Sequence, residues 1–284
     1  MFSIPRSVMI CTHKDGFIYP CDGYLPIHCG RAGSSDKLAI TGDDTGDNIS
    51  CKNKSYCELT AVYWAWKNLK TQYVGLCHYR RYFDFSGKRG WLQNKRIVTE
   101  EEFMKYFCPR TDWGNLLAGH DLILPYPYIH STSIEHDYAI LYNGEDYRTL
   151  RKAVRKVSPE YIEAFETVSA RNFCSYCNMF VMSRELFNIY CEWLFKVLLE
   201  TELLTNITHY NPKQMRIYGF MGERLLNVFV VHHKLKIKYY SIIKVDNNEA
   251  NYSLTKRFYA RAKSELSFFF MRPHFSHPRK RNNN

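Results

Sequence analysis

The stretch that decides the fold is QYVGLCHYRRYF at residues 72–83. Its first half, residues 72–77, is a short apolar run that predicts a buried strand, and its second half is basic and aromatic. A helix precedes the strand, because residues 55–69 carry apolar side chains at helical spacing, namely Leu59, Val62, Tyr63, Trp66 and Leu69. Only two residues separate the helix from the strand. This arrangement is typical of an α/β unit.

The same alternation continues on both sides of this unit. Further strands are expected at residues 7–12, 120–124, 178–182 and 235–240, and further helices at residues 99–107, 134–156, 183–199 and 219–231. The first helix is expected to begin at Ser55, because Ser55 and Glu58 have the S-x-x-E spacing of a capping box. Residues 20–50 are rich in Gly, Asp and Cys without periodicity, which predicts a long surface excursion. The whole pattern predicts an α/β domain over residues 1–245, with a mostly parallel central sheet flanked by helices.

Composition excludes several classes of protein. The chain has 284 residues, of which 45% are apolar and 24% charged, as in globular proteins and unlike disordered or fibrous ones. No apolar run approaches the roughly 20 residues that span a bilayer, and the first residues lack the apolar core of a secretory signal. We therefore expect a cytoplasmic protein whose ten Cys are reduced and packed as small apolar groups.

The net charge of +11 is concentrated at the end of the chain. Residues 251–284 hold eight basic residues and one acidic residue, a charge of +7, which leaves +4 for the first 250 residues. Residues 246–284 form a predicted basic extension that also contains the run Phe268 to Phe270. Basic and aromatic residues together are typical of segments that bind an anionic membrane surface. The alternative is that these residues are a solvated chain end. If the extension does bind membranes, we expect the protein at the inner face of the cell membrane.

Polar side chains follow three of the predicted strands. Thr12, His13 and Lys14 follow the first, His78 to Arg81 follow the second, and Tyr126 and Tyr128 stand near the end of the third. In an open α/β sheet ligands bind at the carboxyl ends of the strands. Cations at that edge favour an anionic ligand such as a diphosphate, whose oxygens match guanidinium groups two at a time. The alternative is that Arg80 and Arg81 form ion pairs with carboxylates such as Asp84 or Glu223.

Several common motifs are absent from the sequence. There is no P-loop and no G-x-G-x-x-G, which argues against a nucleoside triphosphatase and a dinucleotide-dependent dehydrogenase. None of the twelve Asp residues stands two positions from another Asp. The D-x-D signature with which many nucleotide-sugar transferases hold a divalent ion is therefore missing.

Four blocks carry a resemblance to a known family. The blocks are ELTAVYWAWKN at residues 58–68, YVGLCHYRRYF at 73–83, CNMFVMSRELFNIYCEWLF at 177–195 and GFMGERLLNVF at 219–229. In this order and spacing they resemble bacterial capsular and exopolysaccharide glycosyltransferases, a family long catalogued as a domain of unknown function. The resemblance covers about Val8 to Tyr240. It implies a GT-A-like, Rossmann-like nucleotide-binding fold and transfer of a sugar, galactofuranose in some members, from a nucleotide donor to a growing glycan.

The resemblance implies roles for the residues that bind the donor. His78, Arg80 and Arg81 occupy the place where metal-dependent relatives of the fold carry D-x-D, and Tyr79 lies among them. Fixed cations stabilise a diphosphate leaving group as a metal ion does. We therefore expect that no cofactor is required, with Mn²⁺ or Mg²⁺ left open. Thr12, His13 and Lys14 follow the strand that faces the uracil and ribose in such folds.

The acceptor hydroxyl needs a general base if the reaction inverts the anomeric centre. Glu223 is the first candidate, Asp137 the reserve, and His78 a further catalytic residue; a salt bridge between Glu223 and Arg224 is the competing interpretation. Predicted contacts to the acceptor or the sugar are Tyr82, Tyr126, Tyr128, Asn178 and Arg224.

The sequence thus predicts a glycosyltransferase that takes a hexose, galactose or galactofuranose among the options, from a UDP-sugar. The acceptor is a capsular, exopolysaccharide or lipopolysaccharide glycan, free or lipid-linked. One alternative is a module that binds nucleotide sugars without catalysis. The other is a nucleic-acid-binding protein, suggested by the basic pI and the many aromatic residues. Against nucleic acid as a partner, most of the positive charge lies in the C-terminal extension and not in the main fold.

Overall fold

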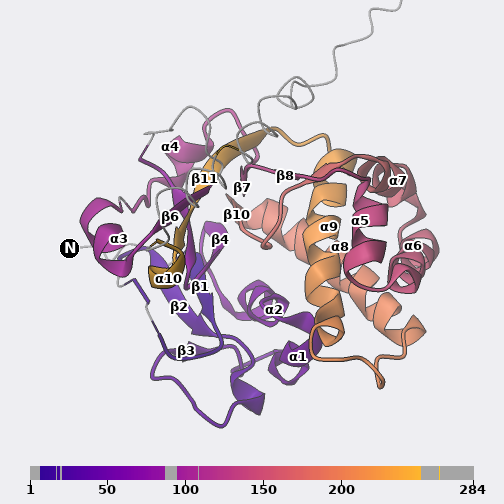
Figure 1. Cartoon of the computed structure of the whole chain (residues 1–284), viewed down its shortest axis with the longest axis horizontal. Coiled ribbons are helices and arrows are strands. Elements are labelled where there is room, and N and C mark those ends of the chain that lie inside the picture. The colour runs from indigo at the N-terminus through magenta and orange to yellow at the C-terminus, as the bar shows by residue number, and fades with distance from the viewer. Residues whose placement is uncertain are drawn as a thin grey trace, which may run out of the picture.

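A computed structural model describes residues 7–16, 18–19, 21–86, 95–107, 109–250 and 262. Nine strands form the main sheet (Figure 1): β1 (Val8–Thr12), β2 (Tyr24–His28), β3 (Thr41–Gly42), β4 (Tyr73–His78), β5 (Arg81–Asp84), β6 (Lys95–Val98), β7 (Leu122–Pro125), β10 (Phe180–Ser183) and β11 (Ile237–Val245). A separate pair consists of β8 (Tyr128–Ile129) and β9 (Phe173–Cys174).

The sheet is mixed, which corrects the expectation of a mostly parallel sheet. β1 lies between β2 and β4 and is parallel to both. β10 runs antiparallel to both of its neighbours, β4 and β7, and β5 runs antiparallel to β11. The sequence could not reveal this because a strand buried on both faces is apolar throughout, whichever direction its neighbours run.

Residues 20–50 are partly integrated in the sheet, so the prediction of a surface excursion is wrong for much of this range. β2 is buried except at the half-buried Pro26 and pairs with β1, and the short β3 pairs with β2. The carboxylate of Asp43 is fully buried and accepts hydrogen bonds from the backbone of Gly30 at 2.8 Å and the hydroxyls of Ser50 and Thr60, each at 2.5 Å. These bonds fasten the loops to the helix that carries Thr60.

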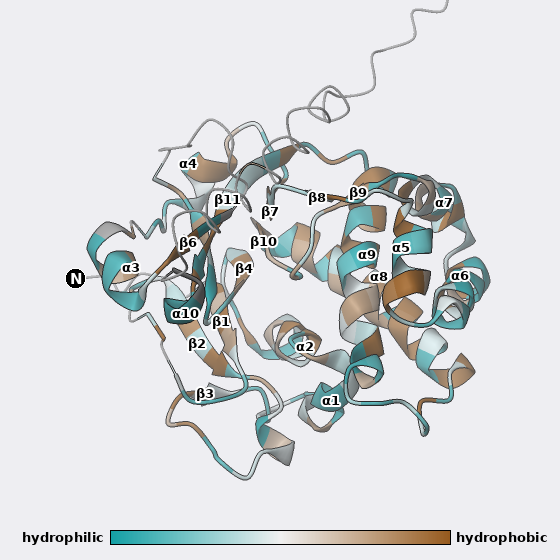
Figure 2. Ribbon diagram, viewed as in Figure 1, coloured by the Kyte–Doolittle hydropathy of each residue, from teal (hydrophilic) through white to brown (hydrophobic). Residues whose placement is uncertain are grey.

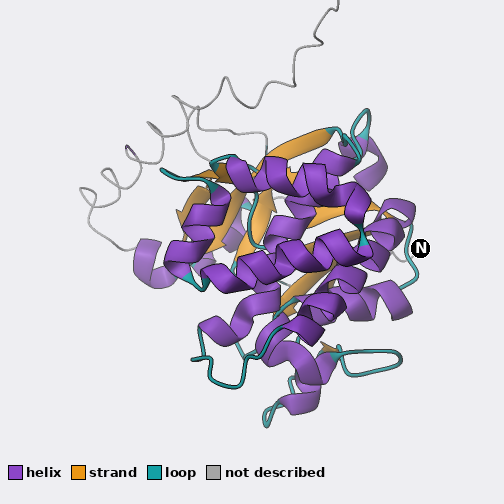
Figure 3. Ribbon diagram, turned by 90° about the vertical axis from the view of Figure 1, so that its right-hand side faces the viewer, coloured by secondary structure: helices purple, strands orange, loops and turns teal. Residues whose placement is uncertain are grey.

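Helices cover the sheet on both faces. They are α1 (Asn53–Tyr56), α2 (Leu59–Asn68), α3 (Glu100–Tyr106), α4 (Trp113–Leu117), α5 (Ile134–Leu141), α6 (Gly144–Val157), α7 (Ile162–Ala170), α8 (Arg184–Leu204), α9 (Ile217–His232) and α10 (Asn247–Ala250). α8 packs against β4 and β10 and also contacts α2, α6 and α9. Figure 3 shows this helical layer in front of the strands. On the opposite face, Phe103 of α3 packs against Tyr82 of β5.

The predicted capping box at Ser55 does not form. Ser55 lies inside α1, and its hydroxyl donates to the backbone oxygen of Lys52 at 3.2 Å. The chain then turns at Cys57, whose φ is 52°, and α2 begins at Leu59 with Glu58 as its N-cap. The Glu58 side chain makes no capping hydrogen bond to α2.

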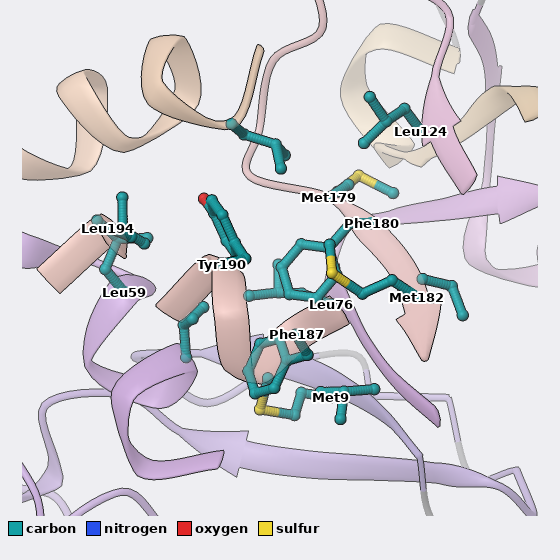
Figure 4. Close-up of a cluster of buried hydrophobic side chains, with 14 of the residues drawn as sticks. Met9, Leu59, Leu76, Leu124, Met179, Phe180, Met182, Phe187, Tyr190 and Leu194 are labelled. Atoms are coloured by element: carbon teal, nitrogen blue, oxygen red, sulfur yellow. The ribbon is translucent and has the colours of Figure 1, made fainter. Parts of the chain in front are cut away.

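One part of the core lies between the sheet and α8. Figure 4 shows Met9, Leu76, Phe180 and Met182 from the strands meeting Phe187 of α8, together with other buried side chains. Hydrophobic residues concentrate on the central strands, while the outer helices α3 and α6 are largely hydrophilic (Figure 2). Burial of this apolar surface is the main contribution to the stability of the fold.

One glycine sets how closely the central strands approach. A Cβ at Gly75 would lie 2.8 Å from the backbone oxygen of Phe180 and 2.9 Å from methyl carbons of Val181 and Val8. Only a residue without a side chain fits between β1, β4 and β10 at this point. Gly75 lies opposite Val8, the first residue of β1, and the carboxyl ends of β1 and β4 lie further along both strands.

The C-terminal extension falls almost entirely outside the described residues, so the prediction of its membrane binding remains a prediction. Within the described part of the chain, no helix combines the length and the apolar character needed to cross a bilayer.

Candidate active site

A cavity of about 600 Å³ opens at the carboxyl ends of β1 and β4. Its walls are the ends of those strands, the turn between α1 and α2, the segment before β10 and the first turns of α9. The lining residues are Cys11, Thr12, His13, Cys29, Asn53, Lys54, Cys57, Glu58, His78, Tyr79, Arg81, Cys177, Arg216, Phe220 and Glu223. The structure therefore brings together two of the three predicted polar clusters.

Strand register explains this assembly. β1 and β4 are parallel with Cys11 opposite His78, so the residues that follow each strand emerge side by side. β10 is antiparallel to β4 with Phe180 opposite Leu76, which places the segment before Phe180 beside the end of β4. His78 Nε2 lies 2.6 Å from the backbone oxygen of Cys177 as a result. Because a carbonyl oxygen only accepts, Nε2 carries the proton and donates.

The segment before β10 has an unusual backbone. Cys177 and Asn178 both have positive φ, 71° and 48°. Asn tolerates this left-handed conformation well, whereas Cys rarely adopts it, so the turn is strained and must be held by its neighbours. The holding contacts are the bond from His78 to the Cys177 oxygen and a bond of 2.8 Å from the Cys177 N–H to Glu223 Oε1. Both contacts come from cavity residues.

Four cationic or ionisable basic side chains line the cavity besides His78: His13, Lys54, Arg81 and Arg216. Among the described residues, no carboxylate forms an ion pair with Arg81 or Lys54. Burial lowers the pKa of His78 and of His13, with the nearby Glu58 opposing the shift at His78. Lysine and arginine charges without a carboxylate partner leave this wall ready for an anion.

Arg80 lies apart from this group. It does not line the cavity, and its guanidinium pairs with Asp246 at 3.2 Å. From the sequence, the alternative to anion binding is an ion pair with Asp84 or Glu223. Arg80 does form an ion pair, but with Asp246, which follows β11. The reason is the tight turn between β4 and β5: His78 pairs with Arg81 across it, and Arg80 occupies the turn itself.

The other predicted donor residues lie at the same edge. Thr12 is buried, and its hydroxyl donates to the backbone oxygen of Lys14 at 2.7 Å, which closes the turn after β1. His13 meets the edge of Tyr79, with 6.1 Å between the ring centres. Tyr79 lines the cavity, whereas Lys14 is exposed just beyond the lining residues.

Two carboxylates face the cavity. Glu223, predicted from the sequence, accepts from the Cys177 N–H and from Arg224 Nη1, the latter at 2.8 Å. Burial raises the pKa of Glu223, with a further increase from the charge of Glu58, while Arg224 opposes both. Glu58 was read from the sequence only as a capping residue. Its carboxylate accepts from Asn178 Nδ2 at 2.8 Å.

Arg224 and Asn178, predicted to contact the acceptor, are both buried. Arg224 is 2% exposed and does not line the cavity; its guanidinium lies over the Tyr176 ring at 4.7 Å and bonds the Phe220 oxygen. Asn178 does not line the cavity, but it donates a hydrogen bond to Glu58, which does.

Four remaining candidates lie away from the cavity. Tyr82 is fully buried on the α3 face of the sheet, and Tyr126 stacks on Tyr239. Tyr128 is exposed on β8. Asp137 forms an ion pair with His130 Nδ1 at 2.9 Å, and His130 Nε2 bonds the Tyr176 hydroxyl at 2.7 Å.

Sequence reasoning missed several lining residues, namely Asn53, Lys54, Cys57, Glu58, Cys177, Arg216 and Phe220. Glu58 and Cys177 stand in blocks that carried the family resemblance, which was a usable signal. Arg216 lies outside those blocks and enters the cavity only because α9 begins there. No group of three or more potential metal-ligating residues occurs in the described ranges.

Comparison with known proteins gives two matches. A family model described as a domain of unknown function, DUF4422, matches residues 7–234, so the chain belongs to that family. Among solved structures, the chain is similar to the apo structure of the bifunctional glycosyltransferase WbbM, with 32% sequence identity and a TM-score of 0.77. The match covers 86% of this chain and 46% of WbbM, so the chain spans less than half of that protein. A search of curated proteins gave no match.

Proposed function

We propose that this protein is a glycosyltransferase that moves a hexose from a UDP-sugar to a glycan acceptor. The observation that carries the proposal is a cavity in which cations without carboxylate partners face two carboxylates, at the strand edge where α/β proteins bind ligands. The similarity to a glycosyltransferase supports it. The mixed sheet, in which β10 runs antiparallel between β4 and β7, supports the proposal of a GT-A-like fold.

The leaving group of such a reaction is UDP, on which negative charge grows as the glycosidic bond breaks. Arg81, Lys54 and Arg216 supply fixed positive charge on the cavity wall, and His78 supplies a polar ring. Preorganised charges of this kind stabilise a transition state without a cost of reorganisation. In this proposal these side chains do the work of a metal ion, and Thr12, His13 and Tyr79 contact the nucleoside.

The acceptor in this proposal is a growing bacterial surface glycan, free or lipid-linked, such as a capsular, exopolysaccharide or lipopolysaccharide chain. A basic C-terminal extension suits work at an anionic membrane, where a lipid-linked acceptor is found. These two points rest on the family resemblance and on the sequence of the extension.

A donor screen tests the proposal. Purified protein is titrated calorimetrically with UDP, and release of UDP is then followed for UDP-galactose, UDP-galactofuranose, UDP-glucose and UDP-N-acetylglucosamine, with water as the default acceptor. We expect one donor to bind and to release UDP slowly. Binding without release identifies a non-catalytic module, and binding of single-stranded RNA or DNA in place of any nucleotide sugar contradicts the proposal.

A further inference from the structure

The two carboxylates of the cavity differ in how many of their oxygens are engaged. Both oxygens of Glu223 hold protein groups, Oε1 the Cys177 N–H and Oε2 the Arg224 guanidinium, each at 2.8 Å. These bonds support the strained turn at Cys177 and neutralise a buried arginine. A carboxylate so engaged is poorly placed to take a proton, because protonation removes the charge that strengthens its bond to the buried Arg224 guanidinium.

Glu58 is bound on one side only. Oε1 accepts from Asn178 Nδ2, and Oε2 has no hydrogen-bond or ion-pair partner among the described residues. The same Nδ2 also donates to the backbone oxygen of Gly219 at 3.1 Å. Two acceptors therefore face this amide nitrogen, which fixes the orientation of the Asn178 side chain. Asn178 is 1% exposed, so it is a rigid support for Glu58.

The charge of Glu58 affects the pKa of several other cavity residues. Burial raises the pKa of Glu223 and of Cys57, and the charge of Glu58 adds to both increases. The same charge opposes the lowering of the pKa of His78 by burial. These three groups lie on α9, on the α1–α2 turn and on β4, which are different walls. Glu58 itself lines the cavity that these walls enclose.

We propose that Glu58 is the catalytic base and that Asn178 is its positioning residue. The inference rests on the proposed glycosyl transfer. In the step, the acceptor O–H gives its proton to Glu58 Oε2 as the acceptor oxygen bonds to the anomeric carbon. The bond between that carbon and the diphosphate oxygen breaks, and its electron pair leaves with UDP. Displacement in one step inverts the anomeric configuration.

The experiment compares isosteric variants of the full chain. Glu58→Gln keeps an oxygen for Asn178 but takes no proton, so UDP release should fall by about 10²–10⁴-fold, the range for loss of a general base. Affinity for UDP should stay within about threefold of wild type, since charge-assisted contacts to the diphosphate remain. Glu163→Gln is the matched control, because Glu163 is exposed on α7 and does not line the cavity.

A second variant separates a chemical role from a structural one. Glu58→Ala leaves space for formate, which should restore turnover in proportion to its concentration. Asn178→Ala should lower kcat while KM for the donor changes little, and formate should not rescue it, since the carboxylate is still present. UDP release by Glu58→Gln at the wild-type rate, or formate without effect on Glu58→Ala, overturns the assignment while the glycosyltransferase proposal stands. Absence of UDP release in the wild type across the donor panel contradicts the glycosyltransferase proposal and this inference with it.

Discussion

Replacing Arg81 and replacing Arg80 should have very different effects, although the two residues are neighbours with the same side chain. Arg81 lines the cavity and has no carboxylate partner among the described residues. Arg80 lies outside the lining and pairs with Asp246 at 3.2 Å, with its own side chain 39% exposed. The pair therefore provides a variant and its matched control within one dipeptide.

The magnitude follows from the contact that each variant loses. A hydrogen bond to a charged group contributes about 1.5–3 kcal/mol. At about 1.4 kcal/mol per tenfold, Arg81→Ala should weaken UDP binding by about 10- to 150-fold. Arg80→Ala removes an ion pair outside the cavity and leaves Asp246 paired with Lys244 at 2.9 Å, so UDP affinity should change by less than about twofold.

Isothermal titration calorimetry with UDP measures both variants against the wild type, and circular dichroism confirms that each is folded. Raising the salt concentration should weaken binding in the wild type more than in Arg81→Ala, because one charge contact is already lost. Equal weakening by the two substitutions would refute the reasoning. So would an unchanged affinity in Arg81→Ala.

Four further predictions follow from the structure and the sequence. Gly75→Ala should lower stability by about 1–3 kcal/mol, measured by urea unfolding, because its methyl group would lie 2.8 Å from the Phe180 oxygen. Burial lowers the pKa of His78, so the folded protein holds this side chain neutral, and its contribution to stability is complete above the unfolded pKa of about 6.5 and decreases as the pH falls below it. The loss of stability between pH 7.5 and pH 5.5 should therefore be smaller in His78→Gln than in the wild type. An equal loss in the two proteins contradicts this prediction. UDP release should persist in the presence of EDTA. If EDTA abolishes UDP release while Arg81→Ala leaves it unchanged, a metal ion, and not Arg81, stabilises the diphosphate leaving group. Deleting the residues after Ser267 should weaken binding to phosphatidylglycerol vesicles in a flotation assay, and unchanged binding would exclude the extension as the membrane contact.

Much of the fold could be predicted from local pattern. The strands at β1, β4, β7 and β10 and the long helix α8 occur close to their predicted positions, because buried strands and an amphipathic helix leave periodic signals. Strand direction could not be predicted, since the reversal of β10 depends on pairing across more than 100 residues of sequence. β2 was missed because Pro26 and flanking Gly and Asp residues make a short central strand look like a loop.

The candidate site was predictable where strand ends carry polar residues, as with His13, His78 and Arg81. The separation of Arg80 from Arg81 could not be predicted, because the sequence pattern did not locate the turn at Tyr79 and Arg80 that divides β4 from β5. Glu58 was not predicted as a site residue, because its spacing from Ser55 matched a capping box. In the structure the turn at Cys57 divides the expected helix into α1 and α2. Tyr82 was misjudged because a residue one position beyond the basic pair lies on the opposite face of β5.

The central claim is that cationic side chains at the carboxyl ends of β1 and β4 receive the diphosphate of a nucleotide sugar. A crystal structure of the protein in complex with UDP tests it most directly. The account predicts pyrophosphate oxygens within hydrogen-bond distance, about 2.7–3.2 Å, of the Arg81 guanidinium, with the nucleoside toward Thr12 and His13. UDP bound outside this cavity, or bound inside it with the pyrophosphate turned away from Arg81, would contradict it.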